Sequence, residues 1–278
     1  DGLMLAVAVE SVVKLIAFLL VGGFVTFQLF DGFVDLTAQA QASPETRPLI
    51  ERMPDWREWL AMTLLSGCAI FLLPRQFHVA VVENRDERDV RTAAWVFPLY
   101  LVAINLFVLP LAIAGHLLLP GAEVDRDMMV LALPIRAGSE LATIAALLGG
   151  ISAATAMVIV STVALSIMVS NDLVIPMALR GRLARGAHEP VDVGFAILTV
   201  RRLVIAAVLA LAYVYARNAH ETALASMGLV SFAAIAQIAP AFFGGLVWRG
   251  GTARGANAGM ISGIAMWAYT MLLPSLNP

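Results

Sequence analysis

Long apolar runs separated by shorter polar segments follow one another along the whole chain. A bilayer core about 30 Å thick needs about 20 mostly apolar residues for each helical crossing, and unpaired backbone groups are costly in hydrocarbon. The pattern therefore predicts an all-α, polytopic membrane protein. We expect seven crossings, at approximately Leu3 to Phe30, Trp59 to Leu73, Thr92 to Leu119, Leu141 to Leu179, Leu203 to Ala216, Leu224 to Trp248 and Ala256 to Leu273.

The fourth expected crossing is too long for one straight span. Gly149 and Gly150 fall within it, and paired glycines are weak helix formers. We expect these glycines to divide the run into a short helix that approaches the membrane and the spanning helix proper. The spanning helix would then begin near Ile151.

The arginines are distributed unevenly between alternate loops, with eleven on one side and six on the other. Because cytoplasmic loops of membrane proteins carry an excess of Lys and Arg, we expect the first helix to run outward and the C-terminus to lie outside. The eleven expected in the cytoplasm are Arg75, Arg85, Arg88, Arg91, Arg180, Arg182, Arg185, Arg201, Arg202, Arg249 and Arg254. The six expected outside are Arg47, Arg52, Arg57, Arg126, Arg136 and Arg217.

Composition agrees with a membrane location and excludes several classes of protein. Apolar residues make up 60% of the 278 residues and charged residues only 14%, against roughly 25% charged in soluble domains. The net charge of −2 offers no polybasic surface for nucleic acid. A single cysteine, Cys68, excludes an intrachain disulfide and a thiolate metal cluster. Since the chain opens at Asp1 directly before an apolar run, we interpret residues 1–278 as one transmembrane domain fragment of a longer protein.

Polar side chains inside the apolar runs are the candidate functional residues, because each needs a partner in hydrocarbon. Ser161 and Thr162 are adjacent in the middle of the fourth crossing. Their hydroxyls, with a carbonyl one turn earlier, could supply hard oxygen ligands for a small cation. The alternative is that the hydroxyls bond carbonyls four residues back or join two helices.

The other intramembrane polar groups favour structural interpretations. Glu10 and Lys14 are four residues apart on the first helix, so they share a face and are expected to form an ion pair. His78 lies in a stretch expected to be an interfacial helix on the cytoplasmic face. Asn171 and Asp172, near the inner end of the fourth crossing, favour capping of the next element over an arginine partner or a gate.

Signatures of catalysis are missing from the chain. The sequence has no GxxxxGK[ST] phosphate loop, no GxSxG nucleophile turn, no HExxH zinc motif and no nucleotide-binding glycine pattern. No catalytic residue is therefore assigned within this fragment.

Two segments resemble the sodium:solute symporter family, to which the sodium/proline symporters belong. The fourth crossing, from Ile151 through Ser161 and Thr162 to Asp172, resembles the helix that carries that family's sodium site. Residues 237–263, with Arg249 in a short basic turn, look like the family's late helix pair.

A third segment is similar to a narrower group. Residues 73–84 contain Pro-Arg-Gln-Phe-His, where ordinary symporters tend to have a Gly-Gln-Pro-His type motif. This motif, together with Met-Val-Ser-Asn-Asp-Leu-Val at residues 168–174, resembles the corresponding segments of the symporter-like input domain of bacterial sensor histidine kinases. The resemblance covers nearly the whole fragment.

The resemblance implies a partial LeuT-type fold of two inverted repeats, with the site at their interface near the membrane midplane. The chain would hold about helices six to twelve of thirteen. Carried over by residue, Ser161 and Thr162 match the hydroxyl ligands for sodium, and Val158 matches the position that supplies a backbone carbonyl. The remaining sodium ligands are expected from an earlier helix that the fragment lacks.

The resemblance is compatible with three functions. The first is a membrane module that binds and transports a small polar solute, such as an amino acid, with sodium and reports to a C-terminal histidine kinase and its response regulator. The second is a stand-alone sodium-coupled symporter. The third is a non-transporting membrane scaffold in which Ser161 and Thr162 are packing residues. In each case we expect a multi-pass protein of the bacterial inner membrane.

Overall fold

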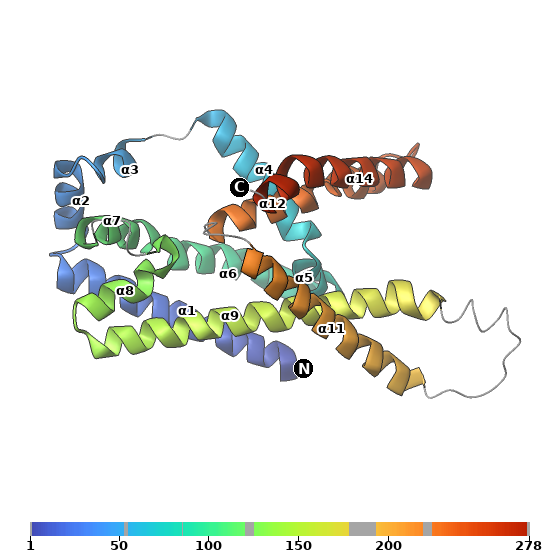
Figure 1. The fold of residues 1–278 in the computed structure, drawn as a ribbon, viewed down its shortest axis with the longest axis horizontal. Helices are drawn as coiled ribbons and strands as arrows, with labels where there is room; N and C mark the ends of the chain where they lie inside the picture. Colours follow the sequence, from blue (N-terminus) through green and yellow to red (C-terminus); the bar gives the residue numbers. More distant parts are fainter. Residues whose placement is uncertain are drawn as a thin grey trace, which may run out of the picture. The chain divides into compact units, whose positions relative to one another are not determined.

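Helices form all the regular structure in the part of the chain that is described. The computed structural model describes residues 2–52, 55–84, 86–119, 125–177, 193–218 and 224–276, and within these ranges no strand occurs (Figure 1). The expected all-α class is confirmed. Residues outside these ranges include Leu179, the expected end of the fourth crossing, and Arg85, Arg180, Arg182 and Arg185.

The α-helices of the described residues are α1 (Gly2–Phe24), α2 (Phe33–Ala42), α3 (Arg47–Glu51), α4 (Trp56–Leu72), α5 (Pro74–Phe77), α6 (Glu87–Asn105), α7 (Val108–Leu118), α8 (Met129–Arg136), α9 (Glu140–Met168), α11 (Val193–Asn218), α12 (Leu224–Ala236), α13 (Ala239–Val247), α14 (Ala253–Trp267) and α15 (Leu273–Leu276). A short 3-10 turn, Arg126–Met128, precedes α8. Helices α1, α5, α9 and α14 each continue into a π-helical turn, at Val25–Leu29, His78–Val82, Val169–Val174 and Ala268–Leu272. Such turns are frequent at functional sites.

Among the described residues, five helical segments are long and apolar enough to cross a membrane. They are Met4–Leu29, Glu87–Leu118, Glu140–Met177, Ile197–Arg217 and Leu224–Val247. A bent pair, Trp56–Leu72 and Pro74–Val82, adds a sixth if the two helices, which meet at 52°, form one broken span. Large apolar side chains remain exposed along these segments, as at Leu99 and Leu211, where 69% and 70% of the residue surface is accessible. The chain is therefore a polytopic helical membrane protein whose apolar faces suit contact with lipid.

The structure differs from the expected map at the fourth crossing. Helix α9 runs without interruption from Glu140 to Met168, so Gly149 and Gly150 do not divide it. The reason lies in packing: a Cβ added at Gly149 would lie 2.7 Å from the Cβ of Ala17 on α1. Gly149 thus lets α1 and α9 approach closely, which offsets the weak helix propensity of glycine.

The seventh expected crossing, Ala256 to Leu273, is helical but is not among the helices long and apolar enough to span. Its main helix, α14, has 15 residues and carries Arg254 and Asn257 near its start. Five or six spans are therefore found among the described residues, where the sequence pattern predicts seven.

The chain divides into two compact units. Unit 1 contains Asp1–Asp55 and Asn84–Val158, and unit 2 contains Trp56–Glu83 and Ile159–Pro278. The boundary falls inside α9, between Val158 and Ile159.

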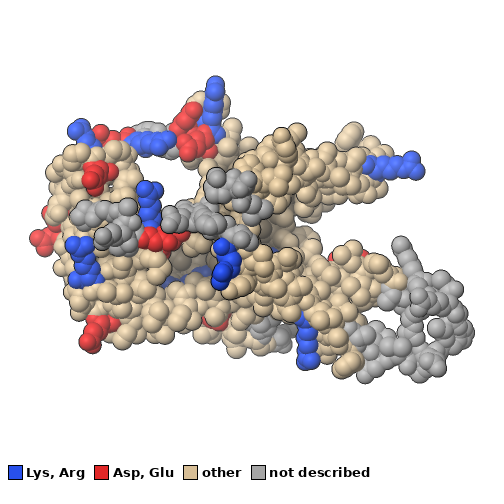
Figure 2. All heavy atoms as spheres, viewed as in Figure 1, with Lys and Arg blue, Asp and Glu red and all other residues tan. Residues whose placement is uncertain are grey.

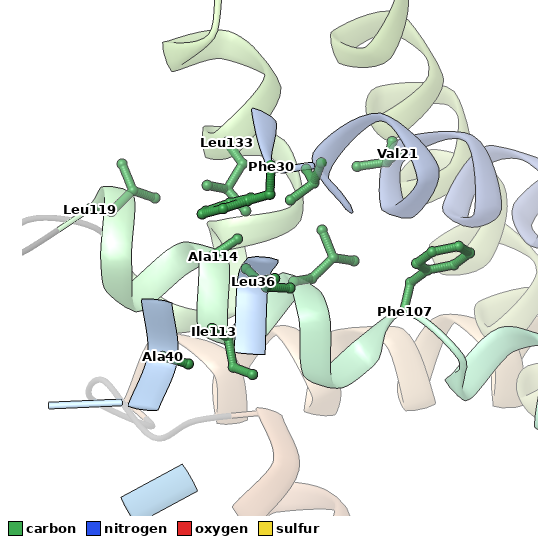
Figure 3. Packing of buried hydrophobic residues seen from close by; sticks show 11 residues of the cluster. Val21, Phe30, Leu36, Ala40, Phe107, Ile113, Ala114, Leu119 and Leu133 are labelled. Carbon is green, nitrogen blue, oxygen red and sulfur yellow. The ribbon is translucent and has the colours of Figure 1, made fainter. Parts of the chain in front are cut away.

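The core of unit 1 lies where α1, α2, α7 and α8 meet (Figure 3). Leu36 on α2, Ile113 on α7 and Leu133 on α8 are each only 1% exposed. Gly22 on α1 faces the side chain of Phe107, which a Cβ at that position would strike. Interlocking apolar side chains and one close helix approach therefore hold these elements together.

In unit 2, α12 packs against α4, and α13 packs against α14. The indole Nε1–H of Trp267 on α14 donates a 2.9 Å hydrogen bond to the carbonyl of Val230 on α12. Edge-to-face ring contacts join Phe71 to Phe243 and Phe77 to Phe242. These contacts tie the bent α4–α5 segment to the C-terminal helices.

The close approach of α1 and α9 is tested by a matched pair of glycine substitutions. Gly149→Ala should destabilise the protein by about 1–3 kcal/mol, because its methyl group would overlap Ala17. Gly150→Ala, whose Cβ would meet nothing within 4 Å, should leave stability unchanged or raise it. Thermal unfolding in detergent measures both. Equal melting temperatures for the two variants would contradict the packing described here.

The orientation inferred from the arginines is tested by cysteine labelling. In a Cys68→Ser background, Glu45→Cys should react with a membrane-impermeant maleimide in intact cells, because the first loop is expected outside. Asp89→Cys should react only after the cells are permeabilised. Both positions are exposed. The reverse labelling pattern would show that the first helix runs inward.

Candidate ion and solute site

Ser161 and Thr162, the expected sodium ligands, occupy consecutive positions of α9 but have different surroundings. Thr162 is only 6% exposed, and its Oγ1 donates a 3.2 Å hydrogen bond to the carbonyl of Ile159. Ser161 is half-buried and makes no side-chain hydrogen bond to any described residue. A serine hydroxyl can donate one hydrogen bond and accept two.

Val158, the expected carbonyl ligand, lies on the same helix one turn before Thr162, and the residue is 47% exposed. Because an α-helix repeats every 3.6 residues, the Val158 carbonyl and the two hydroxyls belong to a single turn. The oxygens of one helical turn can coordinate a cation from one side only. The remaining oxygens have to come from another element, as the resemblance to symporters also implies.

A row of buried hydroxyls continues along α9 beyond the expected site. Thr162, Ser166 and Ser170 lie at intervals of four residues and are 6%, 2% and 0% exposed. Ser166 Oγ donates to the carbonyl of Val163 at 2.8 Å, whereas Ser170 Oγ is buried with no hydrogen-bond partner among the described residues. No role is expected from the sequence for Ser166 or for the Ser170 hydroxyl. Thr162, Ser166 and Ser170 follow one another at intervals of four residues, and this spacing is the sequence pattern that could have identified the two serines.

A polar cluster lies in unit 1, where α1, α6 and α9 meet. Tyr100 Oη donates to the carbonyl of Ser11 at 3.4 Å, and Ser152 Oγ donates to the carbonyl of Glu10 at 3.1 Å. The Lys14 ammonium lies 5.9 Å from the centre of the Tyr100 ring, within cation–π range. Tyr100 and Ser152 are not candidates on sequence grounds, since only the fold brings these helices together.

The expected ion pair between Glu10 and Lys14 stays a prediction. The Glu10 Oε2 atom is buried and has no hydrogen-bond partner within the described part of the chain, while Lys14 faces the Tyr100 ring. Spacing along the helix allows the pair, and the fold adds the contact between Lys14 and the Tyr100 ring of α6. An intramembrane carboxyl group without a partner is a functional candidate by default.

A cavity of about 480 Å³ opens beside this cluster, within unit 1. Lys14 and Asp127 place opposite charges on its wall. The rest of the lining is almost entirely apolar and includes Phe18, Ile104 and Leu131. Its volume falls within the range of small-molecule pockets, roughly 300–1,000 Å³.

His78 lies at the start of the π turn after α5 and is 6% exposed. Its Nε2 is 3.3 Å from Glu83 Oε1, and the Glu83 amide donates to the His78 carbonyl at 2.9 Å. The His78 carbonyl thus accepts the hydrogen bond that ends the π turn, while the interfacial position expected for this stretch stays a prediction. Asp172 is exposed. Residues 178–192, which follow and would contain the element that Asp172 is expected to cap, lie outside the described ranges.

Within the ranges that the structure covers, no group of three or more His, Cys, Asp or Glu side chains could hold a metal ion. Cys68 is a half-buried free thiol.

Fold and site together define the class: a multi-pass helical membrane protein with polar groups inside its spans. No family model, no curated protein and no solved structure matches the chain. The resemblance to sodium:solute symporters stays a prediction that depends on the motifs at residues 73–84, 151–174 and 237–263.

Proposed function

We propose that the chain belongs to a sodium:solute symporter-like domain of LeuT type, which binds and transports a small polar solute together with sodium. In this proposal the domain is the sensory input module of a histidine kinase in the bacterial inner membrane. The observation that carries it is the pair of adjacent hydroxyls, half-buried Ser161 and buried Thr162, in the middle of a membrane-spanning helix.

The state of the Ser161 hydroxyl supports an ion ligand over a packing role. In a membrane, a hydroxyl with a purely structural role donates a hydrogen bond to a carbonyl of its own helix or of a neighbouring helix. Thr155, one and a half turns earlier, does this twice, donating to the carbonyls of Ile151 and Ser152 at 2.9 and 3.1 Å. Ser161 makes no such bond to a described residue, so a ligand oxygen role fits its position.

The cavity in unit 1 supports an amino acid as the solute. Lys14 and Asp127 give its wall one positive and one negative side chain. A small zwitterionic solute with an apolar side chain matches this mixed lining in charge and polarity. The apolar wall takes the side chain of the solute. The proposed solute is therefore an amino acid with an apolar side chain.

The stand-alone symporter remains the second candidate and shares every feature of these 278 residues. The two candidates differ in the length and content of the reading frame after Pro278. A long soluble region with a phospho-accepting histidine there supports the sensor, and a short tail contradicts it.

The ion site is tested with radioactive sodium on the purified full-length protein. Replacing both Ser161 and Thr162 by alanine should weaken sodium binding by about tenfold or more, because two oxygen ligands are removed. Thr155→Ala is the control, since Thr155 is exposed and lies outside the turn that holds Ser161 and Thr162. Undiminished sodium affinity in the double variant would show that the ion binds elsewhere or not at all.

The solute site is tested with leucine and its two singly charged analogues, 4-methylpentanoate and isoamylamine. Leucine should bind more tightly than either analogue, and Lys14→Met should weaken leucine binding by about tenfold or more, because it removes the positive charge from the cavity lining. Arg136→Gln, at an exposed position of the same unit, should have no effect. Equal binding of leucine and 4-methylpentanoate would contradict a zwitterion site.

A further inference from the structure

A groove runs between α13 and α14 within unit 2, and the proposed transport function does not use it. Its volume is about 560 Å³. Glycines line both sides, Gly244 and Gly245 on α13 and Gly255 and Gly259 on α14. Pro240 extends the α13 side.

These glycines are not explained by close packing of the two helices. In membrane proteins, glycines four residues apart commonly let two helices approach. Here a Cβ added at Gly244, Gly245 or Gly259 would meet nothing within 4 Å. These glycines therefore leave space, and the space is a groove lined mostly by small and apolar residues, with Gln237 and Thr252 among its polar lining.

Positive charge gathers at one end of the groove. Arg249 and Arg254 flank the turn between the helices, and both are exposed. Figure 2 shows Lys and Arg side chains at this tip of α14. From residue 224 to residue 278 the sequence contains no Asp or Glu, and neither arginine forms an ion pair with a described residue. The groove therefore ends in two positive charges that no acidic side chain of the described residues compensates.

The length of α13 fits one leaflet of a bilayer. The nine residues of α13 span about 13 Å, and one leaflet supplies about half of a 30 Å hydrocarbon core. Trp248, 70% exposed, lies beside the arginines, and tryptophan is enriched at the headgroup level. The arginine distribution predicts that this turn lies on the cytoplasmic side, where anionic lipids attract basic residues.

We propose that the α13–α14 groove binds one anionic phospholipid. An acyl chain lies along the glycine-lined walls, and the lipid phosphate contacts Arg249 and Arg254. Charge complementarity selects an anionic lipid over a zwitterionic one, and the apolar walls select a lipid over a free phosphate ion. The lipid site is separate from the ion and solute sites and does not depend on the proposed transport function.

The experiment compares phosphatidylglycerol with phosphatidylcholine on the delipidated full-length protein, using native mass spectrometry and thermal unfolding. Phosphatidylglycerol should remain bound and raise the melting temperature, and phosphatidylcholine should do so less. The double variant Arg249→Gln with Arg254→Gln should bind phosphatidylglycerol about tenfold more weakly, because two charge contacts are lost. Arg202→Gln, an exposed arginine on α11, is the charge control.

A second variant tests the groove itself. Gly259→Leu should fill the space without a clash and weaken phosphatidylglycerol binding, while Gly228→Leu on α12, which also meets nothing within 4 Å, should not. Equal retention of the two lipids, or unchanged binding in both the arginine and the Gly259 variants, would overturn the proposal. Loss of a dimer in Gly259→Leu with lipid binding intact would also overturn it, because a second copy would then occupy the groove.

Discussion

Hydrogen bonding in a medium without water is the constraint on which the rest of the structure depends. Backbone groups satisfy it by forming helices, and most hydroxyls satisfy it by donating to a carbonyl of their own helix. Thr63, Ser231 and Thr270 donate to the carbonyl four residues earlier, at 2.8, 2.9 and 2.8 Å. Because polar groups are paired locally, the outer faces of the spans can remain apolar.

Exceptions to this pairing identify the candidate functional groups. Ser161 makes no side-chain bond to a described residue. Ser170 Oγ and Glu10 Oε2 are both buried, and neither atom has a hydrogen-bond partner among the described residues. Each would cost free energy if nothing bound it. An ion, a solute or a further helix would remove that cost, which is why the hydroxyl of Ser161 is central to the proposed function.

Hydropathy predicted the helical class and the regions of the spans, because long apolar runs have few alternatives in a membrane. It could not predict the continuity of α9, since the effect of Gly149 depends on Ala17 of another helix. It placed Glu10 and Lys14 on one face but could not foresee that Lys14 faces Tyr100. The expected ion ligands lie on one turn of α9, while the cavity in unit 1 and the α13–α14 groove required the packed structure.

The central claim is that paired hydroxyls in mid-membrane bind a monovalent cation. A structure of the full-length protein in lipid nanodiscs, determined in sodium and again in a large organic cation, tests it most directly. We expect an ion in contact with the Ser161 and Thr162 hydroxyls in sodium alone. A neighbouring side chain bonded to Ser161 in both conditions would contradict the claim.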